Sequence, residues 1–230
     1  MTDVKAGVEY KISIDDNHFV LDYKKYQLLE YILDTNSLTK SAKMIKISYK
    51  TALNYIYKIE SNLQIKIVDT AKGGKGGGGK TVLTPEGYSI LKECRKINAI
   101  MELHREVNEL EAEIIDIDAD KGVMTVSMKS FEVNIPLNKF YSVGDKVLAL
   151  ISYDNIFLML EPQKSSIRNI IKGNIVEMKL KGEIIRVKVD IGGVAVYSDI
   201  TVSAEKELNL TIGSEIYIGF KAMSVATLKL

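Results

Sequence analysis

Hydrophobic and polar residues follow a helical rhythm in the first third of this chain. Apolar residues recur every three or four positions, which is typical of helices that bury one face. The pattern predicts a helix over residues 23–34, a short one over 39–44 and a third over 48–61. Ile45-Lys46-Ile47 forms a turn before the third helix, and Ser48 is a natural cap for its first turn. We interpret these elements as a helix–turn–helix.

Two short β-type runs, Ile65–Val68 and Thr81–Leu83, enclose a glycine-rich segment over residues 70–80. The segment holds six of the 16 glycines and three lysines. Glycine frees the backbone, so amides and lysines at such a tip can approach a phosphate backbone closely. Alone, the run would read as a flexible surface hairpin. Placed after a helix–turn–helix, it predicts a wing.

A long helix is predicted after the wing. Thr84 is suited to cap it, Pro85 fits the first helical position, and the apolar stripe can extend to about Leu110. Such a stripe packs either on its own domain or on the same helix of a second copy. Proteins that read two DNA half-sites favour the second alternative, a homodimer.

The rest of the chain alternates with a strand-like period and carries short turns. The first set of predicted strands is Glu111–Ile117, Val123–Met128, Glu132–Pro136, Lys146–Ser152 and Ile156–Leu160. The second set is Ile171–Met178, Glu183–Val189, Val194–Ile200, Glu215–Lys221 and Val225–Leu230. Similar turns at Gly144 and Gly213 lie 69 residues apart in the two sets. This repeat favours two tandem five-stranded barrels of the oligonucleotide/oligosaccharide-binding (OB) kind over one larger sandwich.

The expected fold class is therefore α+β and multidomain. Residues 1–107 form a winged helix–turn–helix domain with a dimerisation helix, residues 108–162 a first barrel, and residues 163–230 a second barrel.

Charge separates the first domain from the rest. Residues 36–80 hold nine lysines and two acidic residues, a net charge of +7, whereas the whole chain carries +1. A basic lobe of this kind is typical of nucleic-acid binding, although a charged helix face can also be merely solvated. The candidate DNA contacts are side chains of the third helix and the glycine-rich segment: Ser48, Tyr49, Lys50, Thr51, Asn54, Lys58, Lys72 and Lys75.

Donor groups gather at three strand ends of the second barrel. The candidates are Ser166, Arg168 and Asn169 before its first strand, Thr201 and Ser203 in a later turn, and Lys221, Ala222 and Ser224 before its last strand. Each group alone is typical of an ordinary surface turn that carries a charged residue. Together they suit a tetrahedral oxyanion, whose four oxygens accept hydrogen bonds from every side. In the segment that corresponds to residues 221–224, the first barrel has Asp154, whose negative charge would face the anion. We therefore expect the first barrel to be structural.

Two resemblances sharpen these interpretations. Residues 35–83 resemble the DNA-binding domain of ModE-type molybdate-responsive regulators, in the words Ile47-Ser48-Tyr49-Lys50-Thr51-Ala52 and Gly73-Gly74-Lys75-Gly76-Gly77-Gly78-Gly79. Residues 163–230 resemble Mop-type molybdate-binding domains, in Ser166-Ile167-Arg168-Asn169 and Lys221-Ala222-Met223-Ser224. The resemblance implies molybdate or tungstate bound between barrels by Ser166, Arg168, Thr201, Lys221 and Ser224. The chain departs from the family at Ala204, where members often carry serine.

Other chemistry is disfavoured. Cys94 lies on an apolar helix stripe, and His18 and His104 are far apart without ligand-spaced partners, so we expect no metal site. Lacking a nucleophile–base pair, the chain is not expected to be an enzyme. It shows neither a membrane span nor a secretory leader, which predicts a cytoplasmic protein.

The predicted function is a homodimeric transcription regulator that senses molybdate or tungstate and binds an operator in double-stranded DNA. The alternatives are a storage or buffering protein for the same oxyanions, and a regulator whose barrels serve only dimerisation.

Overall fold

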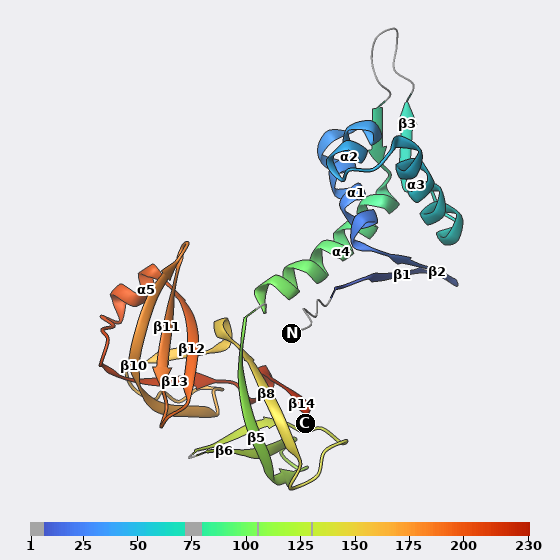
Figure 1. Cartoon of the computed structure of the whole chain (residues 1–230). Helices are drawn as coiled ribbons and strands as arrows, with labels where there is room; N and C mark the ends of the chain where they lie inside the picture. Colours follow the sequence, from blue (N-terminus) through green and yellow to red (C-terminus); the bar gives the residue numbers. More distant parts are fainter. Residues whose placement is uncertain (1–6, 72–79, 105, 130) are drawn as a thin grey trace, which may run out of the picture. The chain divides into compact units, whose positions relative to one another are not determined.

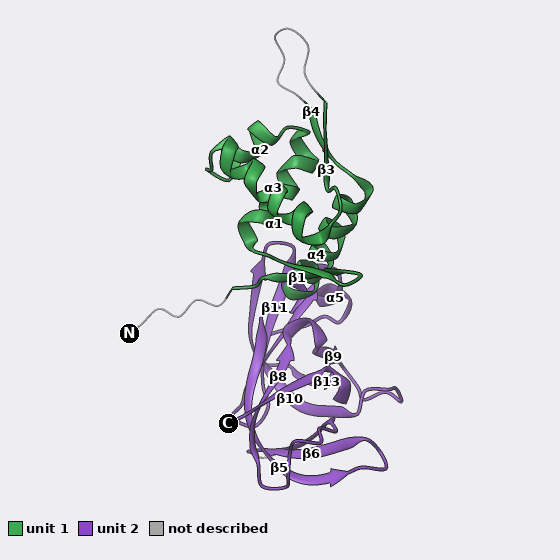
Figure 2. Cartoon of the chain, turned by 90° about the vertical axis from the view of Figure 1, so that its right-hand side faces the viewer, with its two compact units in different colours: residues 1–101 green, residues 102–230 purple. Residues whose placement is uncertain are grey.

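A computed structural model describes residues 7–71, 80–104, 106–129 and 131–230. The chain forms two compact units, residues 1–101 and residues 102–230 (Figures 1 and 2). The described residues combine helices with four β-sheets, two of them five-stranded and two of them hairpins. The predicted wing tip, with Lys72 and Lys75, lies outside the described residues.

The predicted helices of unit 1 are present. They are α1 (Tyr23–Thr35), α2 (Leu38–Met44) and α3 (Tyr49–Leu63), followed by the antiparallel pair β3 (Val68–Ala71) and β4 (Lys80–Leu83). Side chains cap the three helices, because Asp22, Ser37 and Ser48 each accept a hydrogen bond from a first-turn amide. Leu28, Ile32, Ala52, Ile56 and Ile59 lie in the core that joins them.

An N-terminal hairpin, β1 (Tyr10–Ile14) with β2 (Asn17–Leu21), is an element that the sequence analysis missed. The sequence signal for this hairpin was the alternation of the apolar residues Tyr10, Ile12 and Ile14 with polar residues. Tyr10 is buried, its ring lies 5.4 Å from that of Tyr26, and its hydroxyl donates to Asn98. The hairpin therefore belongs to the core of unit 1.

The long helix α4 spans Pro85–Leu103 and ends earlier than the predicted Leu110. Its start is as expected, with the Thr84 hydroxyl accepting from the Gly87 amide at 3.1 Å. The helix stops there because the next strand, β5 (Val107–Asp118), begins at residue 107. From that residue on, buried and exposed side chains alternate, which is the pattern of a strand and not of a helix. Its first half buries Ile90, Leu91 and Cys94, whereas the apolar side chains Ile97, Ile100, Met101 and Leu103 are exposed.

Unit 2 contains two five-stranded antiparallel sheets around one hydrophobic core. The first sheet has the order β14-β8-β5-β6-β7, in which β6 spans Val123–Met128, β7 Phe131–Pro136, β8 Lys146–Ser152 and β14 Val225–Lys229. The second has the order β12-β11-β10-β13-β9, in which β9 spans Phe157–Met159, β10 Asn169–Lys181, β11 Ile184–Asp190, β12 Ala195–Thr201 and β13 Glu215–Phe220. Three short helical turns complete the unit: η1 (Tyr153–Asn155), α5 (Val202–Glu207) and η2 (Ala222–Ser224).

The last strand of each predicted set pairs with the other set. β9 pairs with β13, with Phe157 opposite Gly219, and β14 pairs with β8, with Val225 opposite Ile151. The predicted grouping of these two strands was therefore wrong. Alternation along a strand reveals which side chains face a core but not which sheet the strand joins, and here η1 and η2 lead the chain from one sheet to the other.

Two asparagines connect the sheets at equivalent positions. The Asn108 amide exchanges hydrogen bonds with the backbone of Tyr197, at 2.9 and 2.7 Å, and the Asn169 amide does the same with the backbone of Asn134. Asn108 is the second residue of β5, and Asn169 is the first residue of β10. The repeat inferred from the sequence thus has a counterpart in the contacts between the sheets.

Candidate functional sites

One group of candidate oxyanion residues lies at the start of β10. In the register of β10 with β13, Asn169 is opposite Phe220, so Arg168 and Lys221 both lie directly beyond this pair. Ser166, Arg168 and Lys221 are exposed, and Ser224 is half-buried in η2. The backbone amide of Ser224 donates to the Lys221 carbonyl at 3.0 Å, which closes the turn between them.

The two cations of this group have no ion-pair partner within the described part of the chain. None of the ion pairs between described residues involves Arg168 or Lys221. One guanidinium nitrogen of Arg168 donates to the Ser165 carbonyl at 2.6 Å, which steadies the side chain over its own loop. Two neighbouring cations without a carboxylate create a positive potential that suits an anion.

Asn169 and Ala222 are buried next to Arg168 and Lys221 and hold this end of the sheet in place. Asn169 is 3% exposed, and its amide is engaged with the backbone of Asn134 on β7. Ala222 is also buried, and the η2 turn that it begins packs against β7. Their positions fix the backbone that carries Arg168 and Lys221.

Thr201 and Ser203 lie at the opposite end of β10. Thr201 is opposite Ile184 on β11, and Ile184 is opposite Lys181, the last residue of β10. β10 has 13 residues, and at about 3.3 Å per residue its path measures up to about 40 Å. The structure therefore separates Thr201 and Ser203 from Arg168 and Lys221 within one chain. Figure 1 shows α5, which follows Thr201, at one end of β10, β11 and β12.

The hydroxyls of this second group make local hydrogen bonds. Thr201 caps α5 by accepting from the Ala204 amide at 3.1 Å, and Ser203 donates to Glu207 at 2.8 Å. Thr201 also lines a cavity of about 370 Å³ with Glu106, Asp154 and Asp199 among its walls. An acidic lining of this kind disfavours a dianion unless cations from elsewhere offset its charge.

Arg186 neutralises part of this acidic cluster and is a residue that the sequence analysis missed. Its guanidinium donates to Asp199 at 2.7 and 2.6 Å and to both carboxylate oxygens of Glu106, and it stacks 4.5 Å from the Tyr153 ring centroid. The hydrogen bond from Arg186, followed by that from Lys181, lowers the pKa of Glu106 to about 2. Arg186 is therefore fully committed to carboxylates of its own chain. The only signal for Arg186 in the sequence was its charge at a position on the polar face of a strand.

The candidate DNA contacts lie on the exposed face of α3. Tyr49, Lys50, Asn54 and Lys58 are exposed there. Ser48 and Thr51 are engaged with each other, because the Ser48 hydroxyl accepts from the Thr51 amide at 3.0 Å and lies 2.9 Å from the Thr51 hydroxyl. These two residues fix the start of the helix.

The basic character of unit 1 is exposed around α3. The described lysines of the basic lobe are all exposed: Lys40, Lys43, Lys46, Lys50, Lys58, Lys66 and Lys80. Of the two acidic residues, Glu60 is half-buried and accepts hydrogen bonds from the amides of Ile67 and Val68. The lobe therefore presents mainly positive charge to solvent.

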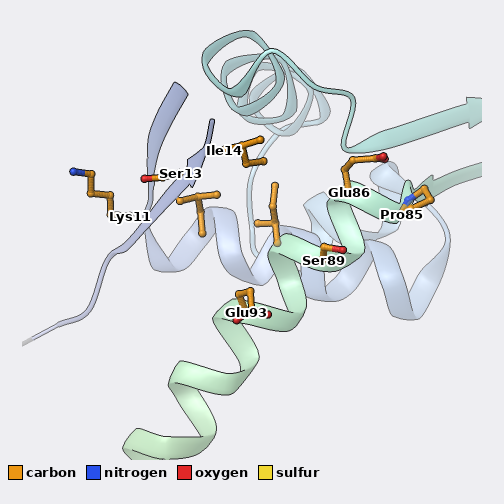
Figure 3. A pocket seen from close by; sticks show the side chains of 9 residues that line it. Lys11, Ser13, Ile14, Pro85, Glu86, Ser89 and Glu93 are labelled. Carbon is orange, nitrogen blue, oxygen red and sulfur yellow. The ribbon is translucent and has the colours of Figure 1, made fainter. Parts of the chain in front are cut away.

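A separate cavity of about 460 Å³ lies between β1 and the first half of α4 (Figure 3). Ile12, Ile14 and Ile90 supply its apolar lining, and Lys11 and Glu93 stand at its edges. None of the candidate site residues lines it.

Two features are absent from the residues that the structure describes. No helix there is long and apolar enough to cross a membrane. Histidine, cysteine, aspartate and glutamate residues within the same ranges form no group suited to a metal ion.

Residues 165–227 match the family model of the TOBE domain. This segment contains every candidate oxyanion residue named above.

The chain is similar to several curated proteins. It is 25% identical over 227 residues to the molybdenum-pterin-binding protein MopB of Rhodobacter capsulatus, covering 84% of each chain. A 71-residue match, 37% identical, links 31% of this chain to 27% of the DNA-binding transcriptional dual regulator ModE of Escherichia coli. Another match, 33% identical over 84 residues, covers 36% of this chain and 24% of the molybdate/tungstate import ATP-binding protein WtpC of Pyrococcus abyssi. The chain thus spans only about a quarter of the length of the import proteins it matches.

Proposed function

We propose that the chain is a homodimeric transcription regulator that binds molybdate or tungstate and an operator in double-stranded DNA. Unit 1 would act as a winged helix–turn–helix, and the two five-stranded sheets would form two OB-like barrels, the first completed by β14 and the second by β9. The observation that carries the proposal is a pair of cations at one end of β10, Arg168 and Lys221, that form no ion pair with the residues that the structure describes. The names of MopB, ModE and WtpC support molybdenum-related oxyanions as the ligand class.

The oxyanion site is proposed to form between two copies. Arg168, Lys221, Ser166 and Ser224 of one copy supply charge and hydroxyl donors. Thr201, with Ser203 and the start of α5, comes from the second copy, because the two groups lie at opposite ends of β10. A dianion bound this way neutralises the two cations and satisfies its oxygens from both sides.

Binding across two copies gives the site a regulatory role. An anion that joins two copies favours one relative placement of them, and that placement sets the separation of their two α3 helices. Operator affinity changes because half-site spacing is fixed by DNA geometry. The exposed apolar end of α4, from Ile97 to Leu103, supports the homodimer by offering a surface for a second copy.

Calorimetric titration of the full chain with molybdate, tungstate and sulfate tests the ligand. We expect saturable binding of molybdate or tungstate, and at least a tenfold loss of affinity in Arg168→Ala and in Lys221→Ala. Lys121→Ala, which removes an exposed lysine from the turn between β5 and β6, is the matched control and should bind normally. Unchanged affinity in both site variants refutes the site. Binding without any effect on DNA affinity supports storage instead, and absence of binding supports barrels that serve only dimerisation.

Gel-shift or anisotropy measurements test the DNA surface. Lys50→Ala and Asn54→Ala should weaken specific binding, whereas Lys75→Ala should mainly reduce its salt dependence. Operator binding that survives all three changes contradicts the assignment of α3 and the glycine-rich segment.

A further inference from the structure

The exposed face of α3 carries an apolar stripe as well as the candidate polar contacts. Tyr49, Leu53 and Tyr57 are 52%, 47% and 67% exposed. They are spaced by four residues, so they lie in one row along the helix, next to the row Lys50, Asn54 and Lys58. Tyr55, in contrast, is half-buried, with the Lys25 ammonium 5.0 Å from its ring. The aromatic contacts available in this stripe are therefore Tyr49 and Tyr57.

The surroundings of the stripe decide what can cover it. Exposed lysines border it at Lys46, Lys50 and Lys58. A partner that buries Leu53 must therefore be anionic at its edges and apolar at its centre. The major groove of duplex DNA meets both conditions, because phosphates line its walls and thymine methyl groups lie on its floor.

Dimensions agree with this partner. Consecutive members of the stripe are about 6 Å apart along the helix axis, and Tyr49 and Tyr57 are about 12 Å apart. The major groove is also about 12 Å wide. Tyrosines at the two ends can thus reach the sugar–phosphate walls while the central leucine contacts base edges.

We propose that Leu53 is a specificity-determining residue that recognises a thymine methyl group in the major groove, flanked by Tyr49 and Tyr57. This inference rests on the proposed DNA-binding function. It adds apolar readout of a T·A pair to the polar readout by Lys50 and Asn54.

The test removes one methyl group at a time from the DNA. The full chain is used to select a preferred duplex from a random library, and each thymine of that duplex is then replaced by deoxyuridine. We expect one replacement to weaken binding by wild type about threefold to fivefold, the factor for one buried methyl group. In Leu53→Ala the same replacement should have no effect. Val20→Ala is the matched control, because Val20 is also 47% exposed but lies on β2.

The outcomes separate the two levels of the proposal. If wild type binds a duplex but no deoxyuridine changes its affinity, or if Leu53→Ala keeps the wild-type sensitivity, the inference about Leu53 is overturned while DNA binding stands. If Leu53→Ala lowers self-association and leaves methyl sensitivity intact, the stripe is a contact between copies and the inference is overturned. Absence of any duplex binding by wild type overturns both the proposed function and this inference.

Discussion

Arg186 shows how one side chain can organise a whole end of unit 2. It joins Asp199 on the neighbouring strand to Glu106, which lies just before β5, and its guanidinium covers the ring of Tyr153 in η1. It is 8% exposed, so its charge depends on these two carboxylates. The acidic surroundings of Thr201 are stable for this reason, and Arg186 is already engaged by these carboxylates.

The Arg186–Glu106 pair predicts a defined pH dependence. The pKa of Glu106 is lowered from its ordinary value of 4.5 to about 2. A lowered folded-state pKa gives stability that is complete above about pH 4.5 and is lost as the pH falls toward 2. Because Glu106 is half-exposed and its pair is screened by water, we expect a contribution of about 1 kcal/mol or less.

Chemical denaturation of Glu106→Gln and wild type between pH 7 and pH 2 measures this contribution. The variant should be less stable at pH 7, and the difference should vanish near pH 2. Glu161→Gln, which removes an exposed carboxylate with no ion pair among the described residues, serves as the control. A constant difference between Glu106→Gln and wild type across the range would contradict the account.

The sequence predicts candidate anion ligands, but it does not predict what surrounds them. Arg168, Lys221 and Ser224 are at strand ends, where local patterns are informative. Asn169 was grouped with the ligands because it belongs to the same sequence motif. Its side-chain amide, however, is hydrogen-bonded to the backbone of Asn134 in the other sheet. A contact between segments 35 residues apart leaves no trace in local spacing.

Strands and helices were predictable as elements and less so in their limits and partners. The helices α1 to α3 follow from periodicity and capping residues, which are local properties. The end of α4 was placed seven residues too late because apolar positions of a helix and of β5 run together near residue 107. The pairing of β9 and β14 depends on the fold of both sheets at once, so periodicity cannot predict it.

The strand exchange predicts which strand loses its partner when the chain is shortened. Removal of residues 225–230 deletes β14, whose partner is β8. We expect amides of β8 to exchange hydrogen faster, with β13 much less affected. Hydrogen exchange followed by mass spectrometry measures both strands in one experiment.

Where the shortened chain does not fold, Val225→Ala provides the same comparison. Val225 is 4% exposed and lies opposite Ile151. Faster exchange in β13 than in β8 would show that β14 belongs with the second sheet, against the pairing described above.

At the scale of the whole molecule, the opposite placement of Arg168 and Thr201 has the largest consequence. The sequence predicted both as ligands of one anion, but the length and register of β10 separate them. Register emerges from long-range pairing, so spacing along the chain does not reveal it. A site built from both residues requires two copies.

Mixed dimers test this arrangement. Arg168→Ala and Thr201→Ala chains, each with a different tag, are co-expressed and their heterodimer is purified. One of its two sites then carries both substitutions and the other carries neither. We expect the heterodimer to bind one anion with wild-type affinity, although both parent homodimers bind weakly. A heterodimer as weak as its parents would show that each site lies within one chain.

The central claim is that an oxyanion bound by Arg168 and Lys221 changes the affinity of the protein for DNA. Linkage requires that molybdate changes operator affinity by the same factor by which the operator changes molybdate affinity. The most direct measurement is therefore a pair of titrations on the full chain, DNA with and without saturating molybdate, and molybdate with and without operator. In wild type, we predict that molybdate and the operator change each other's affinity by the same factor, about fivefold or more. In Arg168→Ala, we predict that neither ligand changes the affinity for the other. Tight binding of both ligands with factors of one in wild type would contradict the account.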